Sequence, residues 1–128
     1  MNILGIGVDI VENSRIRKLL KNKLFIKRIF SNSEILIANK TKDKKSYYSK
    51  RFAAKEALAK SIGTGFRDGL NFKDVSIINN KLGKPSFLIT DKLKKIVKRQ
   101  FRTSSFNFFL SISDEKKYSI ALVILQKN

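Results

Sequence analysis

Two acidic residues stand in surroundings where metal or phosphate chemistry is possible. Asp9 lies inside the apolar stretch GIGVDIVE (5–12), and Glu56 lies among alanines in RFAAKEALAKSIGTG (51–65). Two carboxylates that converge from a strand and a helix can hold Mg²⁺, and the ion keeps further positions for phosphate oxygens. The pair therefore predicts a Mg²⁺-dependent site for a phosphorylated ligand.

A lysine and two short glycine motifs extend this prediction. Lys60 follows Glu56 by one helical turn, so both side chains would lie on one stripe of a helix. The sequences GTG (63–65) and GKP (83–85) offer backbone amides and a lysine to phosphate groups. Neither a Walker motif nor GxGxxG is present, and short glycine motifs alone are weak evidence.

A plain structural interpretation of the same residues stays open. Glu56 and Lys60 would form an exposed ion pair that stabilises the helix by about 0.3–0.5 kcal/mol. Asp9 would begin a turn or cap the helix that follows its strand. Under this interpretation neither carboxylate takes part in a reaction.

The chain contains no cysteine and no histidine. Disulfides, thiolate or imidazole metal ligands, and Ser-His or Cys-His catalysis are therefore excluded, which leaves carboxylates, lysine and hydroxyl groups for any chemistry. Asp9 and Glu12 follow a start without a basic region, unlike a signal peptide. The longest apolar stretch, residues 120–125, is far shorter than the roughly 20 residues of a membrane span. We therefore expect a cytoplasmic protein.

The formal net charge of +18 indicates a polyanionic partner. Nucleic acid is the commonest such partner, so a basic nucleic-acid-binding protein without enzymatic activity is the alternative function. Codon drift toward lysine, asparagine and isoleucine would produce the same excess without a partner. Residues 13–60 hold 15 basic and 3 acidic side chains, a net charge of +12, so most of the excess lies in this segment.

The two acids must be positioned by a strand and a helix. Alternation over residues 3–11 predicts a strand on which Asp9 lies opposite the core-facing side chains. The residues expected to face the core are Leu4, Ile6, Val8 and Ile10. The strongest helical pattern covers residues 47–61, and Gly63 follows it where a left-handed terminating residue belongs.

Further elements are predicted from capping residues and alternation. The helix starts are expected at Asn13 or Ser14, at Ser31, where Glu34 completes a capping-box pattern, and at Thr90 or Asp91. One hairpin joins residues 75–78 to 87–89, and a second joins 108–112 to 118–124. This order predicts a single α+β domain, residues 1–128, with a mainly antiparallel sheet packed against a long central helix.

Four stretches together resemble the holo-acyl-carrier-protein synthases, the small members of the 4′-phosphopantetheinyl transferase superfamily. They are GIGVDIVENSRI, RFAAKEALAKSIGTG, GKP and SISDEKKYSIALVIL, in order within residues 5–125. The resemblance implies the fold of that superfamily and transfer of the 4′-phosphopantetheine arm from coenzyme A to a serine of apo acyl carrier protein. Adenosine 3′,5′-bisphosphate would be released, and the reaction would support fatty acid biosynthesis.

The resemblance also implies roles for single residues. Asp9 and Glu56 match the Mg²⁺ ligands, and Lys60 matches the lysine that stabilises charge on phosphate oxygens. The positions that match the coenzyme A site are Lys55, Lys60, Gly63, Thr64, Gly65, Lys84, Pro85 and Asp114. Arg15 and Arg28 match the arginines that dock the acidic carrier protein. Family members of this size form homotrimers with their sites at the subunit boundaries.

One position departs from the family pattern. Asp114 stands where the family often has histidine, and an aspartate with its usual pKa near 3.9 is a poor base at neutral pH. The general base is therefore open between a metal-bound water, Glu56 and Asp114, and Asp114 could equally be an ordinary turn residue. A degenerate synthase that only binds the carrier protein is a further alternative.

Overall fold

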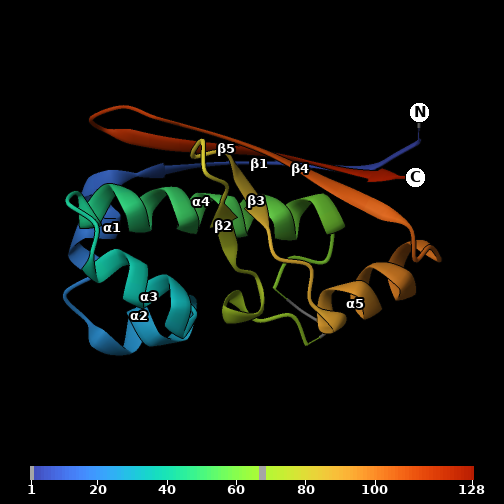
Figure 1. Cartoon of the computed structure of the whole chain (residues 1–128), viewed down its shortest axis with the longest axis horizontal. Coiled ribbons are helices and arrows are strands. Elements are labelled where there is room, and N and C mark those ends of the chain that lie inside the picture. The colour runs from blue at the N-terminus through green and yellow to red at the C-terminus, as the bar shows by residue number, and fades with distance from the viewer. Residues whose placement is uncertain (1, 67–68) are drawn as a thin grey trace.

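The longest helix, α4 (Lys44–Ile62), lies along one face of a three-stranded antiparallel sheet in this computed structural model (Figure 1). The structure describes residues 2–66 and 69–128. Across the sheet the strands are β1 (Asn2–Glu12), β5 (Tyr118–Lys127) and β4 (Phe106–Asp114). The remaining elements are α1 (Asn13–Leu19), α2 (Lys23–Ile29), α3 (Asn32–Asn39), η1 (Phe72–Asp74), β2 (Ile77–Asn79), β3 (Pro85–Phe87) and α5 (Asp91–Phe101).

The glycines of β1 lie directly against α4. A Cβ atom on Gly5 would overlap the carbonyl oxygen of Ser61, and one on Gly7 would overlap that of Ala57. Only residues without a side chain permit this close approach of helix and strand backbones. The alanines around Glu56 allow the same close approach from the helix side, and Ala53 and Ala57 are completely buried.

The prediction of which β1 face meets the core was wrong for three of its four residues, whereas Leu4, at the register irregularity before Gly5, packs against the core. Ile6, Val8 and Ile10 are 59%, 54% and 58% exposed, whereas Gly7 is buried against α4. Apolar alternation identifies two different faces of a strand but does not say which one is covered. Here the helix covers the glycine face, because its backbone comes too close for larger side chains. Asp9 therefore lies on the side of α4.

The other face of this sheet is apolar and exposed. Register pairs Val8 with Leu122 and Ile10 with Ile120, so these side chains share the face turned away from α4. The large hydrophobic residues exposed on this outer sheet face are Ile6, Val8, Ile10, Phe109, Ile120 and Leu122. Monomeric proteins rarely leave such a contiguous apolar surface in water.

Helix ends follow the predicted capping signals in most places. Ser31 and Glu34 form a full capping box at α3, and Gly63 ends α4 with φ of 91°. The helix predicted at Asn13 is present, but its N-cap is Glu12 and lacks a side-chain cap bond. Helix α2 has no counterpart in the prediction, although Asn22 caps its first turn through Leu24 N.

Both predicted hairpins are present in the second half of the chain. Strands β2 and β3 pair antiparallel with Ile77 opposite Phe87, and β4 and β5 pair antiparallel across the turn at residues 115–117. Thr90 caps α5, and Lys92 of this helix forms an ion pair of 2.7 Å with Asp74. The α+β class and the long central helix are thus as predicted. Among the described residues no helix has the length and apolarity to cross a membrane.

Candidate active site

Asp9 and Glu56 lie on facing elements, next to the close contact between Gly7 of β1 and Ala57 of α4. Asp9 follows Gly7 by two residues on the same strand face, and Glu56 precedes Ala57 on the helix. Desolvation raises the pKa of Glu56 above its ordinary value, and the negative charge of Asp9 raises it further. The structure therefore brings the two predicted carboxylates together.

Lys60 completes this group from the next turn of α4. Its Nζ donates hydrogen bonds to Asp9 Oδ1 and to the carbonyl oxygen of Val8, each at 3.1 Å. The ion pair expected between Lys60 and Glu56 is thus replaced by an ion pair between Lys60 and Asp9. The lysine charge still lowers the pKa of Glu56. The Lys60 side chain is about half exposed and stays accessible to a charged ligand.

The donor set fits Mg²⁺. Within residues 2–66 and 69–128, the Glu56 carboxylate makes no hydrogen bond or ion pair, yet it is partly desolvated beside a second carboxylate. No group of three or more acidic side chains suited to a metal occurs among these residues. Mg²⁺ is commonly held by one or two carboxylates together with water and substrate phosphates, so two acids suffice.

The amides of Gly63, Gly65 and Lys84 bond within the chain and are not free for a phosphate. The N–H groups of Gly63 and Gly65 both donate to the carbonyl oxygen of Ala59, at 3.1 and 3.3 Å. These bonds close the C-terminal turn of α4. The amide of Lys84 likewise donates to the side chain of Asn80. A contact of Gly63, Thr64 or Gly65 with coenzyme A remains a prediction, but it would not use the two glycine amides.

Lys55 does not lie at a surface where coenzyme A could bind, and its predicted role is corrected. Its side chain is 0% exposed and forms a 2.7 Å ion pair with Glu34. Adjacent residues of an α-helix point about 100° apart, so Lys55 faces α3 while Glu56 faces β1. Burial lowers the pKa of Lys55, and the carboxylate of Glu34 opposes that shift.

The remaining positions predicted for coenzyme A line separate hollows of this chain. Lys84 and Pro85 border a groove of about 530 Å³ beside Phe108. Asp114 accepts a hydrogen bond of 3.1 Å from the hydroxyl of Ser46 in a different hollow of about 330 Å³. Neither hollow contains Asp9 or Glu56, so one chain does not gather all the predicted residues.

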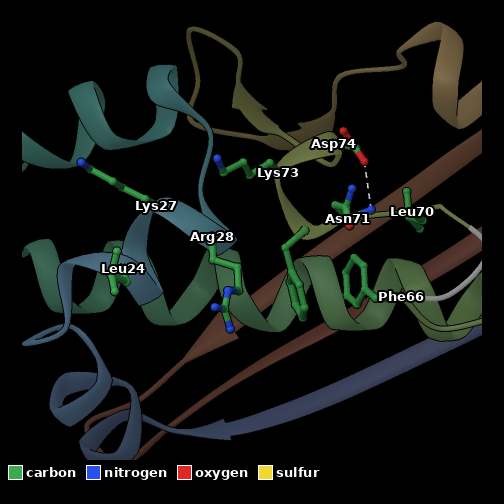
Figure 2. Close-up of a pocket in the computed structure, with 9 residues that line it drawn as sticks. Leu24, Lys27, Arg28, Phe66, Leu70, Asn71, Lys73 and Asp74 are labelled. Atoms are coloured by element: carbon green, nitrogen blue, oxygen red, sulfur yellow. Dashed lines mark hydrogen bonds between the residues drawn. The ribbon is translucent and has the colours of Figure 1, made fainter.

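Arg28 lies beside a hollow with a volume of about 640 Å³ (Figure 2). Phe66 and Phe72 line the same hollow, and Lys27 and Lys73 add positive charge at its border. We call this hollow the Arg28 pocket. Its aromatic wall and basic rim suit a partner that presents both apolar and acidic side chains.

Arg15 borders a smaller hollow of about 270 Å³ together with Phe52. The two hollows are connected by packed aromatic rings. The ring centroids of Phe52 and Phe72 lie 5.8 Å apart, and those of Phe72 and Phe66 lie 3.6 Å apart. Both predicted docking arginines thus flank one aromatic row. The sequence contained these phenylalanines, but their wide spacing gave no sign that they meet.

Arg51 is a candidate that the sequence prediction missed. The guanidinium group lies 3.8 Å above the ring of Tyr47 and donates to Asn79 Oδ1, while its buried Nε has no partner in the described part of the chain. A buried guanidinium nitrogen without an acceptor marks a place where an anion could bind. In the sequence, an arginine before an alanine-rich stretch has no spacing that distinguishes it from other basic residues.

Comparison with known proteins shows the family to which this chain belongs. The family model of the 4′-phosphopantetheinyl transferase superfamily matches residues 5–123, and the chain belongs to this superfamily. A holo-[acyl-carrier-protein] synthase from Pelagibacter ubique is 75% identical over 127 residues, which cover 99% of both chains. The match spans Asp9, Glu56 and Lys60 together.

Solved structures agree with the fold. The crystal structure of holo-[acyl-carrier-protein] synthase from Neisseria meningitidis has a TM-score of 0.89 and 38% identity, covering 98% of this chain and 99% of that chain. A Bacillus anthracis holo-(acyl-carrier-protein) synthase in complex with CoA (3′,5′-ADP) has a TM-score of 0.83 and 32% identity, with both chains covered completely.

Proposed function

We infer that this chain transfers the 4′-phosphopantetheine arm of coenzyme A to a serine of apo acyl carrier protein. The products are holo acyl carrier protein and adenosine 3′,5′-bisphosphate, and the reaction supports fatty acid biosynthesis. The observation that carries this inference is the group of Asp9, Glu56 and Lys60 inside the segment that matches the superfamily. The name of the Pelagibacter ubique relative agrees with it. Nothing specific supports the nucleic-acid-binding alternative.

In this proposal Asp9 and Glu56 would hold Mg²⁺. The ion would supply positive charge to the pyrophosphate of coenzyme A and orient it for attack by the serine hydroxyl. Lys60 presents its ammonium group beside Asp9, where it would bind phosphate oxygens and stabilise their developing charge. The narrow approach of β1 to α4 fixes the two carboxylates before any ligand arrives.

The base that accepts the serine proton is proposed to be a water or Asp114, because Glu56 would hold Mg²⁺ as an ionised carboxylate. The raised pKa of Glu56 describes the protein without the ion, and a bound divalent cation would favour the ionised form. Asp114 accepts a hydrogen bond from Ser46 in a hollow without Asp9, so it would act only at a site completed by a neighbouring chain. A loss of the acidic limb of the rate profile in Asp114→Asn would assign the proton to Asp114, and an unchanged profile would assign it to water.

We propose that the carrier protein docks across the aromatic row between Arg15 and Arg28. Acyl carrier proteins are acidic, and complementary charge steers association and fixes orientation. The Arg28 pocket combines that positive charge with the rings of Phe66 and Phe72. This arrangement favours a partner surface with an apolar centre and acidic rim.

We also propose a homotrimer in the cytoplasm. The exposed apolar residues of the outer sheet face supply a surface that association would bury. The split of Lys84, Pro85 and Asp114 into hollows away from Asp9 favours a site completed by a neighbouring chain. Coenzyme A would then bind at the subunit boundary.

The test of the proposed function is a transfer assay followed by mass spectrometry of the carrier. Purified protein is mixed with apo acyl carrier protein, coenzyme A and Mg²⁺, and the expected product carries the mass of one phosphopantetheine arm. A carrier protein with its acceptor serine changed to alanine is the matched control. Absence of product with several apo carriers would overturn the proposed function.

A further inference from the structure

Lys55 and Glu34 form an ion pair inside the protein that no step of the proposed transfer uses. Their side chains are 0% and 1% exposed, and Nζ lies 2.7 Å from Oε1. Removing two charges from water costs free energy, and apolar residues of similar volume are often at least as stable in such a place. Stability alone therefore does not explain why the pair is present.

The ammonium group of Lys55 has all three donors engaged. Besides Glu34, Nζ donates to the carbonyl oxygen of Phe72 at 2.9 Å and to that of Val75. A lysine has three donors, so this set is complete. The two carbonyls belong to η1 and the residue after it, a segment that returns toward the middle of α4. Lys55 thus fixes the position of this segment relative to the helix.

Glu34 extends the connection to two more elements. Its carboxylate accepts from Ser31 N at 3.1 Å, within the capping box of α3, and from Ile77 N at 3.3 Å, where β2 begins. One ion pair therefore joins α3, α4, η1 and β2. Charged hydrogen bonds at several fixed points define a segment's position more sharply than apolar contact does.

The segment held by Lys55 forms a wall of the Arg28 pocket. The ring centroids of Phe72 and Phe66 lie 3.6 Å apart, and both residues line the pocket beside Arg28. The carbonyl that Lys55 holds belongs to the same residue whose ring forms this wall. A shift of this backbone would move the ring by a similar amount.

We propose that Lys55 is a positioning residue, whose buried ammonium group holds residues 72–75 in place and thereby shapes the pocket that receives the carrier protein. This inference rests on the proposed function, because it takes the Arg28 pocket as the carrier's docking place. Lys55 does not touch the transferred group. Its loss should therefore weaken carrier recognition more than coenzyme A binding.

The test compares Lys55→Met with Leu93→Ala. Methionine keeps much of the length and volume of lysine but has no donor, and Leu93 is a fully buried residue of α5 whose truncation is also destabilising. For Lys55→Met the KM for apo carrier is expected to rise about tenfold or more, with a KM for coenzyme A within about twofold of wild type. For Leu93→Ala both KM values, measured on folded protein, should stay near wild type. Equal changes in the two KM values of Lys55→Met, or the same profile in both variants, would overturn the proposal.

Two further measurements keep the test decisive. Amide hydrogen exchange at residues 72–77 should accelerate in Lys55→Met but not in Leu93→Ala, and unchanged exchange would refute the positioning role even if wild type lacks transferase activity. Inactivity of wild type would count against the proposed function alone. If Lys55→Met does not fold, Phe72→Leu should reproduce the selective rise in carrier KM, and a wild-type KM in that variant would sink the inference.

Discussion

Gly7 lies so close to Ala57 that a Cβ atom on the glycine would overlap the alanine carbonyl oxygen and approach within 2.7 Å of Ser61 N. This contact sets the separation of β1 and α4 next to Asp9 and Glu56. The separation of the two carboxylates therefore depends on the absence of a side chain at position 7.

Gly7→Ala is expected to destabilise the protein by about 3 kcal/mol or more, because the added methyl group would force α4 away from β1 and open the packing between them. Gly63→Ala is the matched control. Its Cβ would meet no atom within 4 Å, and only its φ of 91° opposes the change, at a cost of about 1 kcal/mol. Urea unfolding of both variants measures the difference. Equal losses would show that the close contact does not govern stability.

Glu56→Gln should make the protein without Mg²⁺ more stable at neutral pH while abolishing transfer. A carboxyl with a raised folded-state pKa contributes stability below its unfolded pKa and loses that contribution as pH rises through the folded pKa. Burial and Asp9 both raise the pKa of Glu56 above 4.5, so its ionised form opposes folding at neutral pH.

The free energy of unfolding should rise at neutral pH by a small amount, because solvent screens a half-exposed carboxyl, and the gain should shrink toward acidic pH. Urea titrations in chelator at about pH 7.5 and about pH 4.5 measure it. Asp43→Asn, at the N-cap of α4, is an acidic-to-amide control away from the pair. A loss of stability for Glu56→Gln at both pH values would contradict the assigned electrostatics.

Arg28→Ala should raise the KM for carrier protein and reduce its dependence on salt, with little change in kcat. A charge at the border of an interface mainly changes the association rate, which added salt screens. Lys94→Ala, an exposed charge on α5, is the control and should leave both quantities unchanged. Steady-state kinetics at low and high salt provide the measurement. Identical salt dependence in wild type and Arg28→Ala would exclude docking at this pocket.

Leu122→Glu should dissociate the proposed trimer. Leu122 is 40% exposed in the centre of the outer sheet face, and burying a charge against apolar partners is strongly unfavourable. Leu82→Glu, in the turn between β2 and β3, makes the same change at a fully exposed position. Sedimentation equilibrium should give a trimer for wild type and the control, and a monomer for Leu122→Glu. A monomeric wild type would rule out the proposed assembly.

Local signals predicted much of this structure from the sequence. The capping box of Ser31 and Glu34, the left-handed Gly63 and both hairpins depend on residues close together in the chain, so they were visible there. Asp9 and Glu56 were recognised because acids are unusual among such neighbours. Contacts between distant parts of the chain were harder to predict. The covered face of β1 depends on how closely α4 approaches, and alternation alone does not contain that distance.

The errors at the candidate site have the same origin. Lys55 and Lys60 are both lysines on one helix, but the first points inward to Glu34 and the second toward Asp9. Helical spacing places Lys60 on the stripe of Glu56 and Lys55 off it, but the acid that pairs with Lys55 comes from a separate helix and could not be inferred from that spacing. The Arg28 pocket is likewise formed by phenylalanines that meet only after the chain folds.

The most direct test of the central claim is divalent-metal binding by the protein with coenzyme A, followed by electron paramagnetic resonance of Mn²⁺ as a substitute for Mg²⁺. Wild type and Asp43→Asn should bind the ion with equal affinity, and Asp9→Asn and Glu56→Gln should each weaken binding by at least about tenfold. Equal Mn²⁺ affinity in all four proteins would contradict a metal site shared by the first strand and the central helix.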